Sequence, residues 1–502
     1  MAVALGILTA CGPRTAPAPA VVASRVSIVP EPVSLQMRGG GAFALRDSAV
    51  VVTDAAGDAG VSRVANMLAK LLRTGTGYAV TVRDGGATPR GGIRLRIDGA
   101  RADLGDEGYA LLSTADSVVI TARAPSGVFY GFQTLRQLFP YLIESDIGRR
   151  DTSLWMVPAV SITDVPRYAW RGAMLDVARH FFTVDEVKQF VDLIALYKIN
   201  RLHLHLTDDQ GWRIEIVSRP ELTGKSSSSD IAGGEGGFFT QADYATLVRY
   251  AADRFITLVP EIEMPGHAFA LVSALPETGC NRDNVVCPDS TATWRVLDDV
   301  VREVAAMTPG PWFHIGGDEV ATLSHDEYIR FIERAEKLVN RHGKRMISWE
   351  ESAAASLSPT TIVQQWKGDS VHSAVGSGSK VLLSPSNHVY LDMQYTPSTE
   401  LGLNWAAYIE PRTAYDWDPA TLISGVSDAN IIGVEAPLWT ETIRNITAAF
   451  YMTVPRLPAI AELAWTPQAA RSWDDFRRRI AVHARRWRVL GINYYPSPQI
   501  DW

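Results

Sequence analysis

The chain is organised around the stretch Pro311-Trp312-Phe313-His314-Ile315-Gly316-Gly317-Asp318-Glu319-Val320. Its apolar run before two glycines predicts a buried strand that ends at Gly316. Two adjacent carboxylates directly after a buried strand are costly, because like charges repel in a partly desolvated place. General acid work on a glycosidic bond is one explanation, since one carboxyl must hold a proton while a second group handles developing positive charge. The alternative is an exposed acidic pair that opens the next helix, where the helix dipole favours acids.

Outward from this stretch, apolar strand-like runs alternate with helical patterns from Ile162 onward. Eight such runs favour a (β/α)₈ TIM barrel over an open sheet. An open doubly wound sheet would usually carry a Gly-rich phosphate turn near its first strand, and the sequence has none there. The predicted strands are Gly172–Val177, Arg201–Leu206, Ile256–Ile262, Trp312–Ile315, Arg345–Ser348, Thr361–Gln364, Lys380–Leu383 and Ile431–Val434.

The part of the chain before the barrel predicts a smaller α+β domain, residues 25–161, and leaves residues 162–502 for the catalytic barrel. It mixes short strand-like runs with helical patterns at 61–72 and 126–139, without a repeating βαβ unit. Tyr109–Leu112 and Ser117–Ala122 are predicted to form a hairpin pair. Because no chemical motif gathers here, we expect this domain to support the barrel.

Residues 1–24 are expected to be a lipoprotein signal and a linker. Cys11 closes Leu8-Thr9-Ala10-Cys11 after an apolar start, as in a bacterial signal whose cysteine carries the lipid anchor. No Lys or Arg precedes the apolar run, as a secretory signal should have, so an incidental apolar run is the alternative. Pro13 to Ala20 is a Pro/Ala linker. We therefore expect an exported bacterial protein, periplasmic or anchored to a membrane.

The composition is that of a globular protein, with 46% hydrophobic and 21% charged residues. A net charge of -7 offers no basic face for nucleic acid or an anionic membrane. Cys280 and Cys287 flank a short polar loop and would form a local disulfide in an oxidising compartment; two unrelated thiols are the alternative. The Gly/Ser-rich segment 218–237 predicts a mobile loop over the barrel mouth.

Polar and aromatic side chains follow every predicted barrel strand. Taken singly, each has a structural explanation, such as a helix cap for Asp208 or a core position for His267. Because a barrel builds its active site at the carboxyl ends of its strands, their gathering at one rim predicts a single site. The residues are Arg179, Asp208, Asp209, His267, Asp318, Glu319, Trp349, Trp366, Tyr390, Asp392, Trp439 and Glu441.

At these positions the sequence resembles glycoside hydrolase family 20, the β-N-acetylhexosaminidases. The motifs occur in the family's order and cover nearly all of 166–496. Two departures are small: Glu263 stands where many members have Asp, and Ser348 precedes Trp349 where Gly is common. The matching stretches are Arg171–His180, His203–Trp212, Met264–His267, His314–Val320, Tyr390–Asp392 and Leu438–Glu441.

The resemblance implies a retaining exo-glycosidase that removes a terminal, non-reducing, β-linked N-acetylhexosamine (GlcNAc or GalNAc). The sugar's own acetamido oxygen attacks C1 and gives an oxazolinium intermediate, so no enzyme nucleophile is needed. By motif match Glu319 would be the general acid and then the base. Asp318, expected to stay ionised, would hold the acetamido N–H, and Tyr390 would steer the acetamido oxygen toward C1.

The resemblance also assigns binding tasks. Arg179 would hold the 3- and 4-hydroxyls, for which a guanidinium fork is suited. Asp392 and Glu441 would take the 4- and 6-hydroxyls. Asp208 and His267 would orient Glu319 and tune its pKa, while Asp209 is expected to cap the next turn. The tryptophans would enclose the sugar, with Trp349 and Trp366 around the acetamido group and Trp439 under the ring.

Three alternatives remain open. A disaccharide-releasing enzyme like the lacto-N-biosidases would need an open second sugar site. A non-catalytic carbohydrate-binding barrel should have lost Asp318, Glu319 or Tyr390, yet all three are present. An inverting glycosidase would pair Asp318 with a distant carboxylate. The expected partner is an oligosaccharide, with no metal or organic cofactor. His203 and His205 alternate with metal-ligand spacing, but without a supporting cluster we interpret them as structural.

Overall fold

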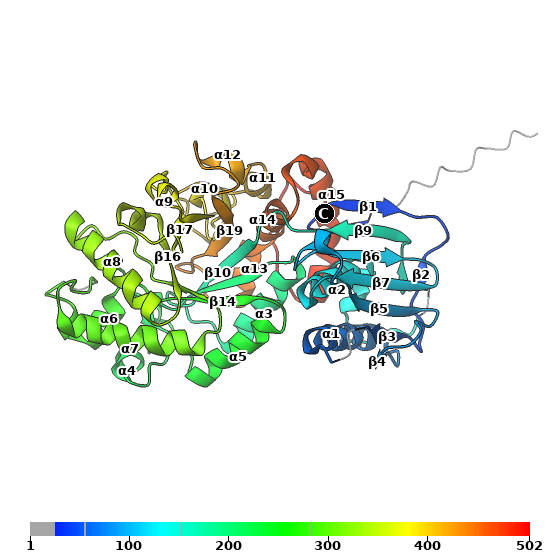
Figure 1. Cartoon of the computed structure of the whole chain (residues 1–502), viewed down its shortest axis with the longest axis horizontal. Coiled ribbons are helices and arrows are strands. Elements are labelled where there is room, and N and C mark those ends of the chain that lie inside the picture. Colours follow the sequence, from blue (N-terminus) through cyan, green and yellow to red (C-terminus); the bar gives the residue numbers. More distant parts are fainter. Residues whose placement is uncertain (1–25, 55–56, 152, 283) are drawn as a thin grey trace, which may run out of the picture.

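The computed structural model describes residues 26–54, 57–151, 153–282 and 284–502. A sheet domain stands beside a larger barrel domain, and the C-terminal helix returns to the sheet domain (Figure 1). The predicted signal and linker at 1–24, with the lipid anchor at Cys11, lie outside the described residues. Among the helices that the structure describes, none combines the length and apolar character needed to cross a membrane.

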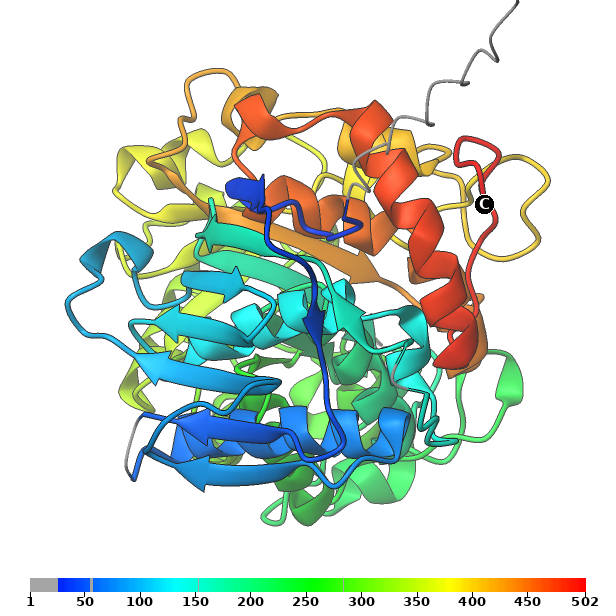
Figure 2. The same ribbon diagram turned by 90° about the vertical axis from the view of Figure 1, so that its right-hand side faces the viewer.

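The N-terminal domain is the predicted α+β layer, and its seven-stranded sheet has the order β1-β9-β6-β7-β5-β3-β4 in the described residues. Helices α1 (Ala59–Thr76) and α2 (Pro125–Leu138) pack between this sheet and the barrel (Figure 2). The predicted hairpin is the antiparallel pair β6–β7. The strands are β1 (Ser34–Met37), β3 (Val50–Thr53), β4 (Thr81–Asp84), β5 (Gly92–Ile97), β6 (Tyr109–Ser113), β7 (Ser117–Ala122) and β9 (Val160–Asp164), and β2 (Phe43–Ala44) pairs with β8 (Met156–Val157) outside this sheet.

The domain boundary expected after residue 161 falls inside β9, which continues to Asp164. Asp164 is fully buried and ties the two domains together. Its carboxylate accepts hydrogen bonds from Lys198 Nζ at 2.9 Å, Trp465 Nε1 at 2.9 Å and the Tyr109 hydroxyl at 2.7 Å. Because these donors come from both domains, the sheet domain supports the barrel through a satisfied buried network.

Parallel strands close the barrel in chain order, and the last, β19, pairs with the first, β10, placing Leu175 opposite Leu438. All the predicted barrel strands are present, with ends that differ by a few residues. The strand predicted to end at Gly316 stops at His314, because Gly316 and Gly317 have φ of 68° and 94°, outside the range of a strand. The strands are β10 (Trp170–Asp176), β11 (Arg201–His205), β14 (Thr257–Glu261), β15 (Trp312–His314), β16 (Arg345–Trp349), β17 (Ile362–Gln365), β18 (Lys380–Leu383) and β19 (Ile431–Leu438).

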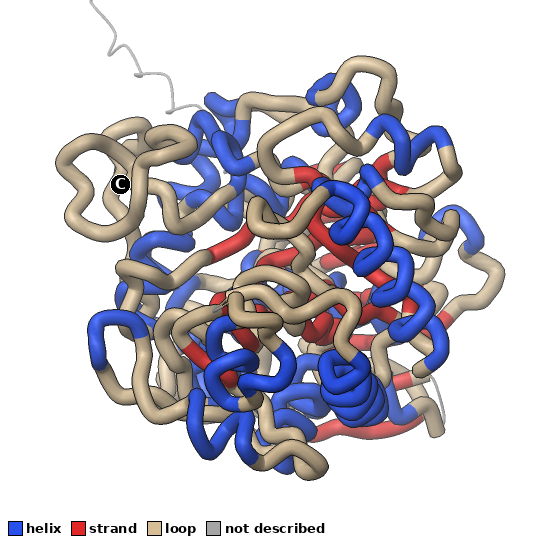
Figure 3. Tube along the Cα trace, turned by 90° about the vertical axis from the view of Figure 1, so that its left-hand side faces the viewer, coloured by secondary structure: helices blue, strands red, loops and turns tan. Residues whose placement is uncertain are grey.

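Helices surround the strands, as Figure 3 shows from the barrel side of the molecule. Several begin at capping boxes that satisfy their first amides, as Thr183 and Glu186 do for α3 and Ser324 and Glu327 do for α8. The longer helices of this domain are α3 (Val184–Leu196), α5 (Gln241–Ala252), α7 (Thr291–Met307), α8 (His325–Arg341), α13 (Ile446–Thr453), α14 (Arg456–Trp465) and α15 (Trp473–Val489). The shorter ones are α4 (Glu221–Ser226), α6 (Phe269–Ala274), α9 (His372–Gly376), α10 (Ser386–Val389), α11 (Pro411–Tyr415) and α12 (Pro419–Leu422).

The segment 218–237, predicted to be a mobile loop, is instead tied to the barrel. It contains α4, and the buried Arg213 guanidinium donates hydrogen bonds to the carbonyls of Ser227 at 3.1 Å and Ser229 at 2.9 Å. The Ile231 amide also donates to the Arg179 carbonyl at 2.9 Å. The glycine and serine content indicated mobility, but Arg213 binds the backbone carbonyls that such a segment leaves free.

Candidate active site

A pocket of about 300 Å³ lies where the barrel strands end, lined by Arg179, His267, Asp318, Glu319, Trp349, Trp366, Tyr390, Asp392, Trp405, Trp439 and Glu441. Every predicted site residue except Asp208 and Asp209 lines it. Asp208 lies behind the wall, where its carboxylate binds Arg179 and His267. The structure thus brings the whole predicted set together, and it adds Trp405.

The acidic pair lies in a turn between β15 and α8. Gly316 and Gly317 turn the chain through the left-handed region, and Glu319 itself has a φ of 56° there. A Cβ atom at Gly316 would lie 1.7 Å from Glu263 Oε2, so this position accepts only glycine. The alternative in which the pair opens the next helix is wrong, because α8 begins later, at His325.

His267 connects Asp208 with the acidic pair. Its Nδ1 lies 3.4 Å from Asp208 Oδ1, and its Nε2 lies 3.8 Å from Glu319 Oε2 and 3.9 Å from Asp318 Oδ2. Burial alone would lower the pKa of His267, but hydrogen bonds to Asp208 and Glu319 and the nearby negative charges raise it to about 11. His267 is therefore an imidazolium at neutral pH. Its backbone lies in the left-handed region, with a φ of 48°.

Asp208 is the buried carboxylate that contacts both Arg179 and His267. Its Oδ2 binds Arg179 Nη2 at 2.7 Å and His205 Nε2 at 3.1 Å. Burial would raise the pKa of Asp208, but Arg179, His205 and His267 hold it far below its usual range. Its neighbour Asp209 accepts a hydrogen bond from the Phe269 amide at 2.9 Å, so it caps the start of α6 and not, as expected, the turn that follows it in the chain.

The pKa values of the two carboxyls in the acidic pair shift in opposite directions. Burial raises the pKa of Asp318 to about 7, more than the His267 charge lowers it. The neighbouring His267 imidazolium lowers the pKa of Glu319, whose side chain is 53% exposed. The shifts differ because Asp318 lies deeper, away from water, while the half-exposed Glu319 lies beside a cation. The ionised Asp318 and the proton on Glu319 expected during catalysis stay a prediction.

Tryptophans and Tyr390 wall one side of the pocket. The Trp349 indole donates to Glu261 Oε1 at 3.0 Å, which fixes the plane of its ring. Trp366 stacks on Tyr390 with a 6.5 Å centroid separation and an interplanar angle of 12°. Trp405 meets Trp366 edge to face at 5.9 Å and is 54% exposed, so it extends the wall outward. Sequence reasoning missed Trp405, since a single tryptophan in a long loop after Asp392 carries no motif.

Polar groups complete the lining of the pocket. Asp392 Oδ1, Glu441 Oε2 and Asp318 Oδ1 are buried and have no hydrogen-bond partner in the part of the chain that the structure describes. Burial raises the pKa of both Asp392 and Glu441. The Arg179 guanidinium lies 4.9 Å from the Trp439 ring centroid. Buried acceptors without donors suit a ligand rich in hydroxyl and N–H groups, since such a ligand would satisfy them.

Beneath the pocket, histidines and glutamates fill the barrel interior. Glu261 binds His203 Nε2 at 3.1 Å, His314 Nδ1 at 2.8 Å and His205, and His203 Nδ1 binds Glu435 at 2.8 Å. This supplies the cluster around His203 and His205 that the sequence did not show. Its atoms are close enough together to hold a metal, as are those of Asp208, Asp209 and His267. Because these acids and imidazoles already form ion pairs, we keep the structural interpretation.

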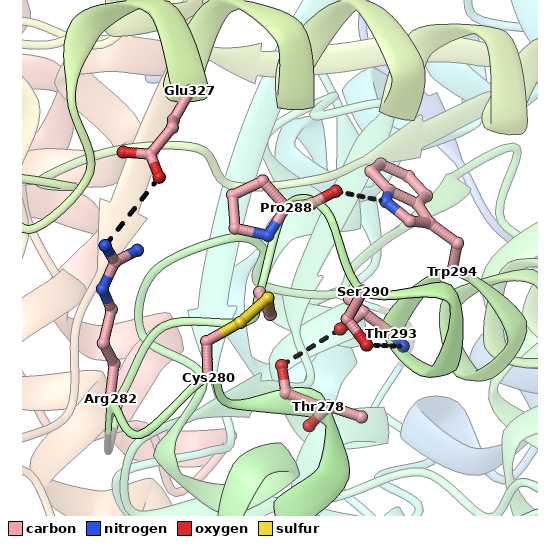
Figure 4. The surroundings of a disulfide bond; sticks show 9 residues. Thr278, Cys280, Arg282, Pro288, Ser290, Thr293, Trp294 and Glu327 are labelled. Atoms are coloured by element: carbon pink, nitrogen blue, oxygen red, sulfur yellow. Dashed lines mark hydrogen bonds and ion pairs between the residues drawn. A yellow bond between two sulfur atoms is a disulfide. The ribbon is translucent and has the colours of Figure 1, made fainter.

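The loop that follows His267 is closed by a disulfide between Cys280 and Cys287, as Figure 4 shows. The bonded pair realises one of the two alternatives left open by the sequence. The loop supports the pocket directly, because the Ala268 amide donates to Asn284 O at 3.1 Å and the Val286 amide donates to Pro265 O at 2.9 Å. The disulfide therefore buttresses the backbone on both sides of His267.

Comparisons with known proteins agree with this geometry. The model of "Glycosyl hydrolase family 20, catalytic domain" matches residues 168–468, and that of "Glycosyl hydrolase family 20, domain 2" matches residues 25–165. The β-N-acetylhexosaminidase of Cellulomonas fimi is 42% identical over 95% of this chain and 97% of its own length. The β-hexosaminidase of Porphyromonas gingivalis is 36% identical over 94% of this chain and 65% of its own length.

Solved structures show the same relationship. The Streptomyces plicatus N-acetyl-β-hexosaminidase in complex with Thio-NAglucal superposes with a TM-score of 0.91 at 42% identity, covering 95% of this chain and 97% of that one. The exo β-N-acetylglucosaminidase of Vibrio harveyi, in complex with N-acetylglucosamine, gives 0.83 at 29% identity and covers 93% of this chain and 78% of that one. Fold, pocket and sequence thus agree, and the chain belongs to glycosyl hydrolase family 20.

Proposed function

We propose that this glycoside hydrolase is an exo-acting β-N-acetylhexosaminidase that uses the substrate's own acetamido group as the nucleophile. The observation that carries the proposal is the buried Asp318 Oδ1, which lacks a donor among the described residues and shares a pocket with Trp349, Trp366 and Tyr390. An acetamido N–H would satisfy this oxygen, and the aromatic rings would enclose the acetamido methyl group.

The sugar is held by its hydroxyls and by its ring face. Arg179 donates to the 3- and 4-hydroxyls, while Asp392 and Glu441 accept from the 4- and 6-hydroxyls. Trp439 lies under the pyranose ring. These contacts fix C1 close to Glu319 and place the acetamido oxygen for attack, with Tyr390 donating to that oxygen.

In the first step the acetamido oxygen forms a bond to C1 as the bond from C1 to the leaving oxygen breaks. Glu319 gives its proton to the leaving oxygen. Asp318 accepts a hydrogen bond from the N–H of the oxazolinium ring and so stabilises the positive charge of that ring. In the second step water attacks C1, Glu319 takes a proton from it, and the C1–acetamido oxygen bond breaks. Two inversions at C1 retain the β configuration.

The mechanism needs a proton on Glu319 and a negative charge on Asp318, and substrate binding moves both pKa values in that direction. A leaving group over the half-exposed Glu319 excludes water from it and raises its pKa toward that of a general acid. A donated N–H, together with His267, favours the ionised form of Asp318. Bound substrate thereby favours the protonated form of Glu319 and the ionised form of Asp318.

The pocket volume of about 300 Å³ lies at the lower end for ligand sites and favours one sugar over two behind the cleavage point. This observation supports monosaccharide release over the disaccharide-releasing alternative. Export of the protein, expected from the N-terminal sequence, is part of the proposal, and the Cys280–Cys287 disulfide supports it because such bonds persist in oxidising compartments.

Rates on p-nitrophenyl β-glycosides of GlcNAc, GalNAc and glucose test the proposal. We expect turnover of one or both acetamido sugars and negligible turnover of the glucoside; substantial glucoside activity would contradict acetamido participation. Proton NMR of the first product should show the β anomer. An α anomer formed initially would support the inverting alternative instead.

A further inference from the structure

Glu263 is a carboxyl in the site to which the mechanism gives no task. It lies two residues beyond the end of β14 and is 2% exposed. Its amide donates to Thr207 Oγ1 at 2.9 Å, but within the described ranges neither of its carboxyl oxygens has a hydrogen-bond partner. The nearest imidazole nitrogen, His205 Nδ1, lies 3.9 Å from Oε1.

The Glu263 carboxyl fills the space behind the acidic turn. A Cβ atom at Gly316 would lie 1.7 Å from Oε2 and 2.1 Å from the carboxyl carbon, so the Glu263 head rests against the Gly316 backbone. Gly316 is two residues before Asp318. The long glutamate side chain therefore reaches and supports the turn that presents Asp318 to the pocket.

The charges facing Glu263 disfavour its ionised form. Negative groups face it from three elements: Glu261 on β14, Asp208 after β11 and Asp318 after β15. The positive groups are Arg179 after β10 and His205 on β11. Both are bound to other carboxylates, since each forms an ion pair with Asp208. An ionised Glu263 would therefore be a buried charge without compensation.

Burial and then the charges of Asp318, Glu261 and Asp208 raise the pKa of Glu263 well above its usual range. Asp318 is the member of the pair that ionises first, because His267 Nε2 lies 3.9 Å from its Oδ2. The negative charge of Asp318 then favours the protonated form of Glu263, because two nearby carboxylates repel each other.

We infer that Glu263 is a protonated positioning residue, a neutral carboxylic acid that supports the Gly316–Asp318 turn and leaves the negative charge to Asp318 alone. The inference rests on the proposed contact of Asp318 with the acetamido N–H. It gives the glutamate at this position a task of its own: its side chain reaches the turn without adding a second negative charge.

Glu263→Gln tests the inference, because glutamine copies the shape of a neutral carboxylic acid. We expect kcat at neutral pH within about threefold of the parent and an acidic limb of the kcat profile that does not move. If Glu263 were ionised, removing its charge would lower the Asp318 pKa and move that limb down by about one pH unit. Such a shift, or a large loss of kcat in a folded variant, would overturn the inference.

Glu261→Gln is the matched control, since it removes a carboxyl equally buried and two residues away on the same segment. Glu261 is ionised among histidines, and its charge raises the pKa of Asp318. We expect this control to lower stability and move the acidic limb downward. If both variants behaved alike, Glu263 would not differ from an ionised neighbour, and the inference would fail.

An infrared difference spectrum between the parent and Glu263→Gln at neutral pH reads the protonation state directly. The carbonyl stretch of a protonated carboxylic acid should be present in the parent and absent from the variant. If the variant instead lacks carboxylate bands that the parent has, the inference is overturned. The infrared measurement does not depend on whether the enzyme hydrolyses its substrate. Failure of the proposed function would appear elsewhere, as glucoside turnover with the infrared result intact.

Discussion

The Nε2 atom of His267 lies 3.8 Å from Oε2 of Glu319, so a permanent positive charge sits beside the proposed general acid. That charge favours the carboxylate form of Glu319. The strength of this acid is therefore set by the histidine and by Asp208, which holds it, as much as by the carboxyl itself.

Glu319→Gln should remove most of the activity on substrates with poor leaving groups, because these need a proton on the departing oxygen. We expect a loss of about 10²–10⁴-fold on chitobiose-like substrates and a much smaller loss on activated aryl glycosides. Steady-state rates on both substrate types measure the difference. Equal losses would argue against an acid task for Glu319.

His267→Gln should shift the pH profile in a defined direction. Loss of the imidazolium raises the pKa of Glu319, so the alkaline limb of kcat/KM, where the acid form is lost, moves to higher pH. His342→Gln is the control, since His342 forms a 2.7 Å ion pair with Asp298 and does not line the pocket. The tuning task would be refuted by an unmoved limb in the first variant.

Asp318→Asn should weaken the binding of a thiazoline that mimics the cyclic intermediate. Loss of a charged hydrogen bond costs about 1.5–3 kcal/mol, or roughly ten- to a hundredfold in affinity. In the parent, affinity should rise as pH passes about 7, where Asp318 ionises, and this rise should vanish in the variant. Calorimetric titration across that range checks both points. Unchanged affinity would rule out the acetamido contact.

Replacing both Cys280 and Cys287 with Ser should lower stability by about 2.5 kcal/mol, the loop-closure contribution expected for so short a loop. Because the loop holds Pro265 and Ala268 beside His267, kcat should fall as well. Thermal unfolding and steady-state rates measure the two effects. A reductant should act on the parent and leave the double variant unaffected; similar sensitivity of both would show that the disulfide is not the cause.

Trp405→Ala should affect substrates with a sugar leaving group more than aryl glycosides. An exposed aromatic at the pocket rim offers a stacking face worth about 0.5–1.5 kcal/mol. KM for the disaccharide should therefore rise several-fold with little change for the single-sugar aryl substrate. Trp502→Ala, at an exposed tryptophan that does not line the pocket, is the control. Equal changes on both substrates would contradict a leaving-group contact.

The barrel was predictable because strands buried on both faces are near-continuous apolar runs, as residues 381–383 and 431–434 are. The pocket followed from the position of its residues directly after those strands. The buried cluster was not predictable, since Glu435 on β19 meets His203 on β11 only through barrel closure. The opposite pKa shifts of Asp318 and Glu319 depend on how deeply each side chain is buried and on the position of His267. Two adjacent acidic residues in a sequence do not reveal which of them is buried.

The left-handed backbone at Glu319 and His267 carries an evolutionary consequence. A side chain in this region costs roughly 1–2 kcal/mol, which glycine avoids. Replacement of the half-exposed Glu319 by glycine would therefore give a more stable protein with the same fold and the same sugar-shaped pocket. At His267 the relief of strain is opposed by the loss of a partner for the buried Asp208. A mutation to glycine at Glu319 is favoured by stability and opposed only by selection for catalysis. A lineage released from that selection would therefore evolve toward more stable proteins that bind the sugar without cleaving it.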